Sequence, residues 1–593
     1  MKQILRAETA AVVAEIHVSP GEAVAAGGLL LTTELMKMRH DIRAEAACVV
    51  NAVHVAAGDA LDGGERLITF TPGGDAVAAI VDEAPRRDFT EFTARLALLK
   101  DAARPDAVAR RHAKNMRTAR ENIADLLDEG SFTEYGGLAV AAMRRTRGMD
   151  DLTTRTQADG IITGTGTVNG RAIAVMAVDY TVLAGTQGYH HHHKMDRLIE
   201  VARAKQGRDA LPIVLFAEGG GGRPNDTDAA EMIVAGLNIT SFRQFAAHKG
   251  PKIGVVAGYC FAGNAALFGV CDLRIATRNS NIGMGGPAMI EGGGLGRVAP
   301  TDIGPADVQT KNGVIDLLVD DEATAVSAVK QILGVTSDAA ALSGDDAALR
   351  DVVPADRTKA YDMRRALTAL ADAETWFEIR RGFGAGMIVG FARIKGRGVG
   401  LIANNPLHLG GAIDAEAADK GARFLQLCDA WGIPVVTLCD TPGFMVGPAV
   451  EETGQVAHVS RLFLAGAHFG QPMVTIILRK AYGLGAMAMA GGGFDRPDYC
   501  CAWPSGEIGA MGLEGAVKLG AREHLAAIED PAAREAEYQR LVDQLYERGK
   551  ALNAASLLEF DAVIDPAESR AEITRALSAA GPASPSGGYV DAW

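Results

Sequence analysis

The chain has 593 residues, too many for one hydrophobic core, so we expect several domains. Hydrophobic residues make up 48% and charged residues 22%, as in globular enzymes, and 70 glycines favour tight turns and close backbone approaches. The net charge of -14 argues against a nucleic-acid-binding surface. The seven cysteines lack CxxC spacing, which indicates reduced thiols, and no run approaches the ~18 apolar residues of a membrane helix. We therefore expect a soluble cytoplasmic protein with neither nucleic acid nor membrane as a partner.

The first predicted domain, residues 1–72, contains two copies of one pattern. EIHVSPGEAVAAGG and AVHVAAGDALDGG start at positions 15 and 52, an offset of 37 residues. Each copy alternates apolar and polar residues before a glycine turn, which predicts short strands in an all-β sandwich with pseudo-twofold symmetry. Lys37 lies midway between the copies, where a hairpin tip would hold its side chain in solvent.

The segment ELMKM, residues 34–38, resembles the tip of biotinyl carrier domains, in which a lysine between two methionines accepts biotin. This resemblance implies covalent biotin on Lys37. Lipoyl domains share the sandwich but usually flank their lysine with Asp and Ala, so biotin is favoured over lipoate. The alternative is that Lys37 is an ordinary exposed lysine, which would require neither flanking methionines nor symmetric arms.

A linker and a second duplication follow. The Gly- and Pro-containing composition after Phe70 predicts a flexible linker at residues 73–88, and helical spacing follows from Phe89 to about Asn122. Two segments then match at an offset of 226 residues, ITGTGTVNGRAIAVMAVD and VGFARIKGRGVGLIANN. At an offset of 222 residues, LPIVLFAEGGGG matches IPVVTLCDTPGF, and Gly263 matches Gly485. Because each half alternates strands and helices, we predict two similar α/β domains at 89–340 and 341–593.

Each half contains a strand that ends in glycines, at Glu218–Pro224 and at Arg479–Met487. A strand-to-helix turn of this kind exposes backbone N–H groups and the positive end of a helix, which together stabilise an oxygen that gains negative charge. The alternative is that these glycines only close turns or let helices pack. Equivalent clusters in two duplicated halves favour the functional interpretation.

The body also resembles a known family, over about residues 88–525. Five segments are similar to motifs of the carboxyltransferase component of biotin-dependent acyl-CoA carboxylases. They are DYTVLAGTQG, EGGGGRP, DTPGFMVG, RKAYGLGAMAM and WPSGEIGAMGLEGAV. That component has a crotonase-like fold of two homologous halves. A carrier followed directly by a carboxyltransferase resembles the C-terminal part of single-chain long-chain acyl-CoA carboxylases, without the biotin carboxylase part.

The resemblance implies roles for the two glycine turns. The N–H groups of Gly221 and Gly222 are expected to hold the thioester oxygen of acyl-CoA, with Gly219 and Gly220 shaping the turn. The second turn is expected to hold the ureido oxygen of biotin through residues Gly483, Leu484, Gly485 and Ala486. In this mechanism carboxybiotin on Lys37 releases CO2, the biotin nitrogen takes the α-proton, and the enolate attacks CO2. No side-chain base is required, and none stands out beside either motif.

The resemblance also implies partners. These are acyl-CoA as substrate, a biotin protein ligase, and a separate biotin carboxylase subunit that uses ATP, Mg and bicarbonate, because no GxxxxGK[ST] loop is present here. A homo-hexamer is expected, with each active site between the first half of one chain and the second half of another. The rival functions are an acyl-CoA decarboxylase or transcarboxylase and, in another class, a non-catalytic biotin carrier scaffold. Intact glycine turns in both halves argue against the scaffold.

Other motifs are more ambiguous. HHHH at 190–193 is expected to start a helix, on which consecutive residues point about 100° apart, so no metal site is expected there. Asn169-Gly170 predicts a hairpin turn. Asp440 is either an acid catalyst or a structural residue at a strand end, and Arg479 and Lys480 either contact CoA phosphates or cap a strand. Apolar Met487 leaves the acyl group undefined, and the Gly, Pro and Ser content of residues 578–593 suggests a mobile tail.

Overall fold

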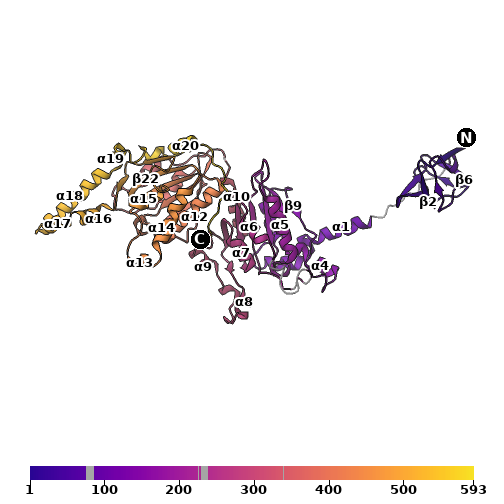
Figure 1. Ribbon diagram of the computed structural model, residues 1–593, viewed down its shortest axis with the longest axis horizontal. Coiled ribbons are helices and arrows are strands. Elements are labelled where there is room, and N and C mark those ends of the chain that lie inside the picture. Colours follow the sequence, from indigo (N-terminus) through magenta and orange to yellow (C-terminus); the bar gives the residue numbers. More distant parts are fainter. Residues whose placement is uncertain (75–85, 225, 227, 229–237, 338) are drawn as a thin grey trace. The chain divides into compact units, whose positions relative to one another are not determined.

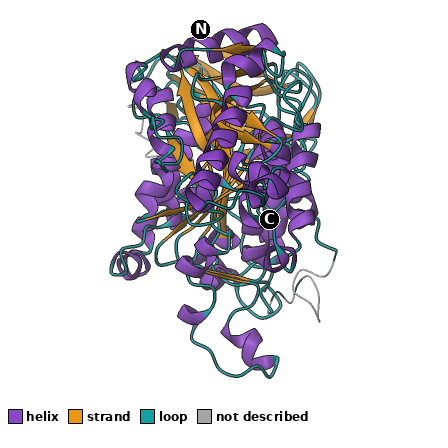
Figure 2. Ribbon diagram, turned by 90° about the vertical axis from the view of Figure 1, so that its left-hand side faces the viewer, coloured by secondary structure: helices purple, strands orange, loops and turns teal. Residues whose placement is uncertain are grey.

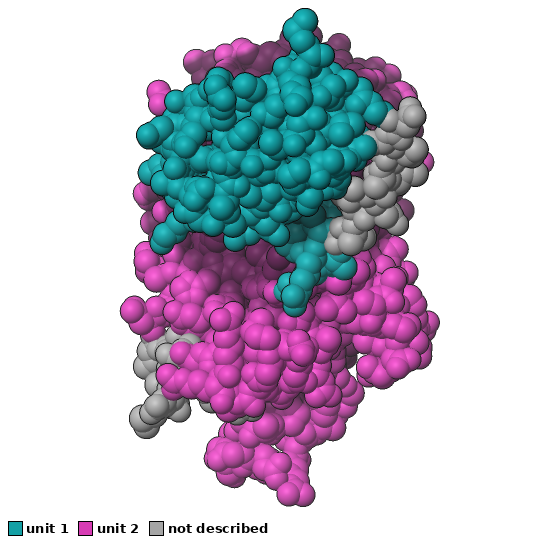
Figure 3. All heavy atoms as spheres, turned by 90° about the vertical axis from the view of Figure 1, so that its right-hand side faces the viewer, with its two compact units in different colours: residues 1–93 teal, residues 94–593 magenta. Residues whose placement is uncertain are grey.

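The computed structural model describes residues 1–74, 86–224, 226, 228, 238–337 and 339–593. It divides into two compact units, Met1–Thr93 and Ala94–Trp593 (Figure 3). Most of the predicted linker, at 75–85, lies outside the described residues, and the domain boundaries proposed from the sequence stay predictions. Within the described ranges, no helix is long and apolar enough to cross a membrane.

The first unit consists of two four-stranded sheets, β1-β8-β6-β3 and β5-β4-β2-β7. Their strands are β1 (Gln3–Arg6), β2 (Ala11–Ile16), β3 (Ala23–Val24), β4 (Leu29–Leu35), β5 (Met38–Arg43), β6 (Cys48–Val53), β7 (Ala60–Leu61) and β8 (Arg66–Pro72). β6, β7 and β8 repeat β2, β3 and β4 at an offset of 37 residues, and the buried pairs Val13/Val50 and Leu31/Ile68 have the same offset. The predicted symmetric sandwich is therefore confirmed, because alternating apolar residues of both copies fill one shared core.

The first half of the second unit is built on a seven-stranded sheet, β17-β15-β13-β12-β11-β10-β9. Its strands, with those of a small β14-β16 sheet, are β9 (Thr133–Tyr135), β10 (Ile161–Val168), β11 (Arg171–Val178), β12 (Ile213–Phe216), β13 (Lys252–Val256), β14 (Tyr259–Phe261), β15 (Leu273–Thr277), β16 (Asn281–Gly283) and β17 (Leu317–Val319). From β11 to β17 the pairing is parallel, whereas β9, β10 and β11 pair antiparallel. The predicted hairpin turn at Asn169-Gly170 is confirmed, since Val168 pairs with Arg171 and both turn residues have positive φ.

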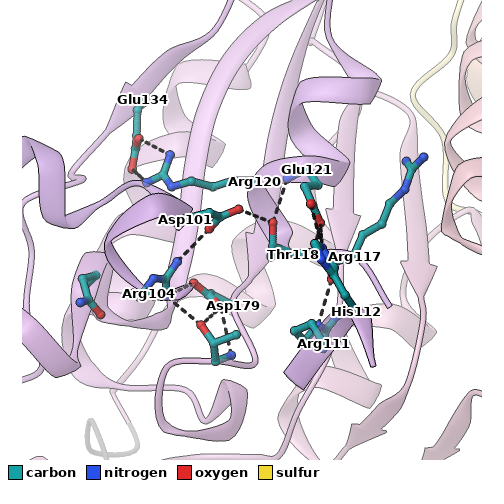
Figure 4. Close-up of polar contacts among 12 residues, drawn as sticks. Asp101, Arg104, Arg111, His112, Arg117, Thr118, Arg120, Glu121, Glu134 and Asp179 are labelled. Carbon is teal, nitrogen blue, oxygen red and sulfur yellow. Dashed lines mark hydrogen bonds and ion pairs between the residues drawn. The ribbon is translucent and has the colours of Figure 1, made fainter. Parts of the chain in front are cut away.

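Helices cover this sheet and lead into it (Figures 1 and 2). They are α1 (Arg87–Leu98), α2 (Pro105–His112), α3 (Ala119–Leu126), α4 (Met149–Arg155), α5 (Tyr189–Ala202), α6 (Ser241–Ala246), α7 (Gly263–Gly269), α8 (Pro287–Gly292), α9 (Ala306–Lys311) and α10 (Glu322–Val335). Thr118 starts α3 with a capping box to Glu121, and Figure 4 shows the polar network that joins this region to the sheet, including Arg104 with Asp179 at 2.8 Å. The predicted leading helices and the helix start at the histidine run are confirmed.

The second half repeats the plan with an eight-stranded sheet, β18-β19-β20-β21-β22-β23-β25, in which β24 pairs with β22. The strands are β18 (Phe377–Ile379), β19 (Met387–Ile394), β20 (Arg397–Asn404), β21 (Val435–Thr441), β22 (Met473–Tyr482), β23 (Tyr499–Ala502), β24 (Glu507–Gly509) and β25 (Ala562–Val563). The helices are α11 (Arg364–Leu370), α12 (Ala415–Trp431), α13 (Pro448–Glu451), α14 (Gln455–His468), α15 (Gly483–Met489), α16 (Leu513–Gly520), α17 (Arg522–Ala526), α18 (Pro531–Gly549), α19 (Ala551–Ser556) and α20 (Ser569–Ala580). β10, β11 and α5 recur as β19, β20 and α12 at the predicted offset of 226, so the duplication is confirmed.

The two halves are joined by one hydrophobic core. α10 packs on β15 and β17 of the first half and on β19 and β20 of the second, and buried side chains of both halves form one cluster.

The C-terminal tail differs from the mobile segment that its composition predicted. Arg423 donates to the carbonyl oxygen of Asp591 at 2.8 Å, and the indole N–H of Trp593 donates to Asp419 at 3.0 Å. Polar anchors on α12 therefore hold a segment whose composition suggested a free end.

Candidate functional site

The tip of the first unit is a two-residue turn between β4 and β5. Leu35 pairs with Met38, and the turn residues Met36 and Lys37 have φ of +51° and +66°. This left-handed conformation costs non-glycine residues roughly 1–2 kcal/mol each, and such strain is concentrated at functional positions. Met36 is 90% exposed, Lys37 is exposed, and no hydrogen bond or ion pair of the described residues includes the Lys37 side chain. The tip can therefore carry a covalent group without disturbing the sandwich.

The first glycine turn follows β12. Gly219 has φ of +100°, its N–H donates to the carbonyl oxygen of Tyr259 at 2.6 Å, and an added Cβ would lie 2.5 Å from the carbonyl oxygen of Ala184. Only glycine fits there. Across the part of the chain that the structure describes, the N–H groups of Gly220, Gly221 and Gly222 donate no hydrogen bond. They are free to hold an oxygen of a ligand.

Two buried side chains fix this turn. The amide nitrogen of Asn264 lies 3.0 Å from the carbonyl oxygen of Gly185, 2.9 Å from that of Glu218 and 2.7 Å from that of Gly220. Gln187 donates its side-chain amide to Asn264 at 2.9 Å and its backbone N–H to Gly221 at 2.9 Å. The carbonyl oxygens of the turn are thus occupied, which keeps the turn in one conformation.

Arg223 ties the end of the turn to the start of α5. Its guanidinium contacts Asp159 at 2.5 Å and Asp226 at 3.2 Å, and Asp226 accepts the N–H of Tyr189, the first residue of α5, at 2.7 Å. Arg223 is only 3% exposed, so this ion pair is part of the interior. The helix that we expected directly after the turn falls on residues outside the described ranges.

The second glycine turn joins β22 directly to α15. Gly483, Leu484 and Gly485 form the first turn of this helix, where backbone N–H groups have no intrahelical acceptor and the helix dipole is positive. An added Cβ on Gly485 would lie 2.7 Å from Cα of Gly443, so the loop after β21 requires a glycine here. Leu484 is 61% exposed, whereas Ala486 is buried. The predicted strand-to-helix turn is present.

The structure adds residues that the sequence argument missed. A Cβ on Gly221 would lie 2.7 Å from Cβ of Ala262 and 3.5 Å from the nitrogen of Gly263, the first residue of α7. In each half, a glycine of one loop therefore lies against the first turn of a helix further along the chain. Gly221 lies against Gly263 of α7, which follows β14, and Gly443 lies against Gly485 of α15, which follows β22. In the sequence, the only signs of these contacts were the match of EGGGG with DTPGF and the match of Gly263 with Gly485.

The match between α7 and α15 needs one correction. Tyr259 of β14 pairs with Asn281 of β16, and Lys480 of β22 pairs with Glu507 of β24. Asn281 and Glu507 are equivalent at the offset of 226, so their partners Tyr259 and Lys480 are equivalent too. The offset between the segments before the two helices is therefore 221 and not 222. Ala262 and Gly483 then correspond, and both have φ near +50°. Gly263 therefore corresponds to Leu484 and Asn264 to Gly485. A single glycine match could not fix the register, because strand pairing decides it.

A buried ion pair lies at the start of each glycine segment. Asp440, fully buried, pairs with Arg479 at 3.0 Å, and Arg479 also donates to the carbonyl oxygen of Lys359 at 2.7 Å. Lys480 donates to the carbonyl oxygen of Gly410 at 3.0 Å. These contacts favour the structural interpretation of Asp440, and Arg479, at 2% exposure, faces the interior and not a phosphate.

In the first half the equivalent acid is Glu218, which contacts Arg111 of α2 at 2.6 Å. Arg111 also lies 3.8 Å from Glu322 at the start of α10. Burial raises the pKa of Glu218 to about 7, although Arg111 opposes this shift. One arginine thus serves two buried carboxylates, and Glu218 is the acid that gains a proton near neutral pH.

The histidine run divides between two sides of α5. His191 and His192 are buried, and burial lowers the pKa of both imidazoles, that of His192 to about 4. His190 and His193 lie on a different face, together with Lys194 and Arg197. The described residues contain no group of three or more His, Cys, Asp or Glu side chains that could hold a metal ion.

Free backbone N–H groups beside helix starts, in a chain with an exposed lysine tip, are features typical of group-transfer proteins that stabilise an anionic oxygen and present a tethered group. The chain belongs to the carboxyl transferase family: the family model "Carboxyl transferase domain" matches residues 110–584. A second model, "Biotin-requiring enzyme", matches residues 4–70. Carboxyl transfer that involves acyl-CoA, with biotin as the cofactor, is the activity of this family.

Named relatives support this assignment. The chain is 34% identical over 498 residues to the biotin-dependent long chain acyl-coenzyme A carboxylase beta4 subunit of Mycobacterium tuberculosis, covering 81% of this chain and 92% of the relative. A solved single-chain, multi-domain long-chain acyl-CoA carboxylase is 49% identical with a TM-score of 0.78, and the match covers 97% of this chain. The chain spans only 56% of that enzyme's length. The transcarboxylase 12S structure, described as a hexamer assembly, is 28% identical to this chain with a TM-score of 0.73. The match covers 87% of this chain and 100% of the 12S chain.

Proposed function

We propose that this chain is the biotin carrier and carboxyltransferase subunit of an acyl-CoA carboxylase, and that Lys37 is the biotin attachment site. The observation that carries the proposal is that each half places a loop glycine against the start of a helix, Gly221 against α7 and Gly443 against α15, in a chain that also has an exposed lysine tip. Bound biotin supplies an activated carboxyl group. The chain itself holds two oxygen atoms through backbone N–H groups, one in each half.

The two sites differ in the substrate that we assign to them. Gly221, Gly222 and the added Gly263 hold the thioester oxygen of acyl-CoA, so that negative charge can develop there when the α-carbon loses its proton. Gly483, Leu484, Gly485 and Ala486 hold the ureido oxygen of biotin. Removing one such donor typically costs about 3 kcal/mol in the transition state, which lowers turnover by roughly 100-fold.

A separate biotin carboxylase subunit that uses ATP, Mg and bicarbonate charges the biotin in this proposal, and a biotin protein ligase attaches it. The 12S transcarboxylase, which is described as a hexamer assembly, supports a homo-hexamer. We propose that each active site of this hexamer lies between the first half of one chain and the second half of another. All seven cysteines are free and buried, which suits the cytoplasm.

The acyl group is proposed to be apolar and long. Met487, 39% exposed, lines a pocket of about 650 Å³ in the second half that also includes Gly483 and Ala486 of the proposed biotin site, and most of its lining is apolar, including Phe494 and Ile508. In the proposed hexamer this pocket faces the first half of another chain, so the acyl group of an acyl-CoA held there can enter it. The long-chain names of two relatives agree with this choice. Turnover with CoA thioesters of increasing chain length tests it, and a strict preference for acetyl-CoA would contradict it.

The test of the whole function is Lys37→Arg in the full chain. We expect no carboxylation with the biotin carboxylase partner, because arginine cannot accept biotin, while free carboxybiotin still supports slow transfer to acyl-CoA. Lys2→Arg, an exposed lysine outside the tip, is the matched control and should keep full activity. Full activity of Lys37→Arg would refute tethering at this position. ATP-independent transfer between two CoA thioesters, without such a partner, would instead favour the decarboxylase or transcarboxylase alternative.

A further inference from the structure

The tail segment, residues 584–593, lies along α12 and runs from the end of this helix toward its start. The hydroxyl of Ser586 donates to Asp429, near the end of α12, at 2.7 Å, and the indole N–H of Trp593 donates to Asp419, near the start, at 3.0 Å. Between these two acceptors the helix rises by about 15 Å. Figure 1 marks the C-terminus beside α12 and α14. The tail segment therefore follows much of the length of α12.

Arg461 of α14 holds the tail segment and α12 together. Its guanidinium pairs with Asp591 at 2.6 Å and with Asp419, and it donates to the main-chain oxygen of Trp593 at 3.1 Å. On the preceding turn of α14, Nδ1 of His458 lies 2.7 Å from the carboxylate of Asp419. Asp419 is only 1% exposed, so these contacts belong to the interior, where hydrogen bonds are strong. The end of the tail segment thus completes a network that fixes α14 against α12.

α14 in turn holds the loop that contains Gly443. Gln455, the first residue of α14, donates its side-chain amide to the carbonyl oxygen of Met445 at 3.3 Å. The ring of Phe444 packs edge-on against that of Phe463 on α14, with the ring centroids 6.0 Å apart. Gly443 itself lies against the first turn of α15, where the N–H groups of the second amide site are found. A shift of α14 would therefore move the loop that shapes this site.

The two ends of the tail segment have different partners. At its beginning, an added Cβ on Gly587 would lie 2.9 Å from Cβ of Lys249, a residue of the first half. Contacts of this kind join the two halves and serve general stability. At its end, the polar contacts that Asp591 and Trp593 make with the rest of the chain go to α12 and α14. A role in the second amide site is therefore separable from a role in stability.

We propose that Asp591 and Trp593 are positioning residues of the second amide site. They hold α14, and through α14 the loop at Gly443, so that the N–H groups at the start of α15 keep the geometry that binds the ureido oxygen of biotin. Both residues act through α14 and not on the reacting atoms. This inference rests on the proposed function, since it takes biotin as the group held at this site.

The experiment uses the full chain with Lys37→Arg, so that free carboxybiotin is the only donor, and combines Asp591→Ala with Trp593→Ala on this background. We expect KM for carboxybiotin to rise about 3- to 10-fold, the range of one lost hydrogen bond. KM for acyl-CoA should not change, because its amide site is in the first half. Tyr589→Ala is the matched control: it removes an aromatic side chain of the same segment that is 81% exposed, and it should leave both KM values unchanged.

A second measurement tests for rescue. A chain that ends at Ala583 lacks the tail segment, and the synthetic peptide SPSGGYVDAW, which has the sequence of residues 584–593, is added to it. We expect the peptide to restore KM for carboxybiotin, and the same peptide with Asp591→Ala and Trp593→Ala to have no effect. Restoration by both peptides, or by neither, would overturn the inference.

The outcomes for the double variant separate positioning from stability. An unchanged KM for carboxybiotin would overturn the inference, and so would equal increases of both KM values or a lower kcat alone, which would make the role a general structural one. Calorimetric titration of the Lys37→Arg chain with biocytin, the biotin amide of lysine, keeps the inference separate from the proposed function. If this chain binds biocytin but transfers no carboxyl group to any acyl-CoA, and the double variant binds biocytin more weakly, only the proposed function fails.

Discussion

The two halves of the second unit place a glycine loop against a helix start in the same way, but they support it differently. In the first half, the side chain of Asn264 contacts three carbonyl oxygens of the surrounding loops. In the second half, the equivalent residue is Gly485, and the loop backbone at Gly443 occupies the space of the missing side chain. A polar side chain and a close backbone contact therefore solve one problem, which is to hold a turn with its N–H groups exposed.

The ion pairs beneath the turns differ as well. Asp440 has its own arginine, Arg479, from the neighbouring strand, whereas Glu218 shares Arg111 with Glu322. In the second half two cations, Arg479 and Lys480, thus surround one carboxylate, whereas the first half has an excess of buried negative charge that protonation of Glu218 can remove. Duplicated sites can therefore keep their backbone geometry while their electrostatics diverge.

The largest effect is expected from Arg479→Met. The variant leaves the buried Asp440 with only Lys480, 3.9 Å away, as a cationic partner, which should destabilise the protein by about 3–5 kcal/mol. Arg111→Met is the matched variant in the first half and should cost clearly less below neutral pH, because Glu218 can take up a proton. Denaturant midpoints at pH 6 for both variants measure the difference. Equal losses would mean that the two supports are electrostatically alike.

The next effect concerns the close contacts at the turns. Gly221→Ala and Gly485→Ala each place a Cβ 2.7 Å from a neighbouring atom, so the amides must move. We expect turnover to fall by roughly 100-fold in both variants, comparable to losing one oxyanion donor. Gly269→Ala, at the end of α7 with open space around it, is the control and should retain activity. A normal rate for either turn variant would remove that turn from the reaction.

The smallest effect is a change of pH dependence in Glu218→Gln. Because the folded state raises the pKa of Glu218 from 4.5 to about 7, folding favours the protonated acid. This contribution is fully present below pH 4.5 and is lost as the pH rises through about 7. As the pH rises from 4.5 to about 7, the wild type loses this contribution and the variant does not. The stability of the variant relative to the wild type should therefore increase by roughly 1–3 kcal/mol over this pH range. A constant difference between the two proteins from pH 5 to 8 would show that Glu218 does not titrate there.

The sequence by itself determined both duplications, the exposed lysine tip and the location of the glycine turns. These features depend on local patterns, namely alternation for strands, glycine where φ is positive, and repeated spacing, and each pattern can be read from neighbouring residues. The motifs at residues 34–38, 218–224 and 479–487 carried that information.

Only the tertiary structure decided which residues meet. The contact of Gly221 with Gly263, the one-residue shift that pairs Asn264 with Gly485, and the anchoring of the tail by Arg423 all join segments far apart in sequence. Sheet register and side-chain packing set these contacts, and both are properties of the whole fold that no local window of sequence contains.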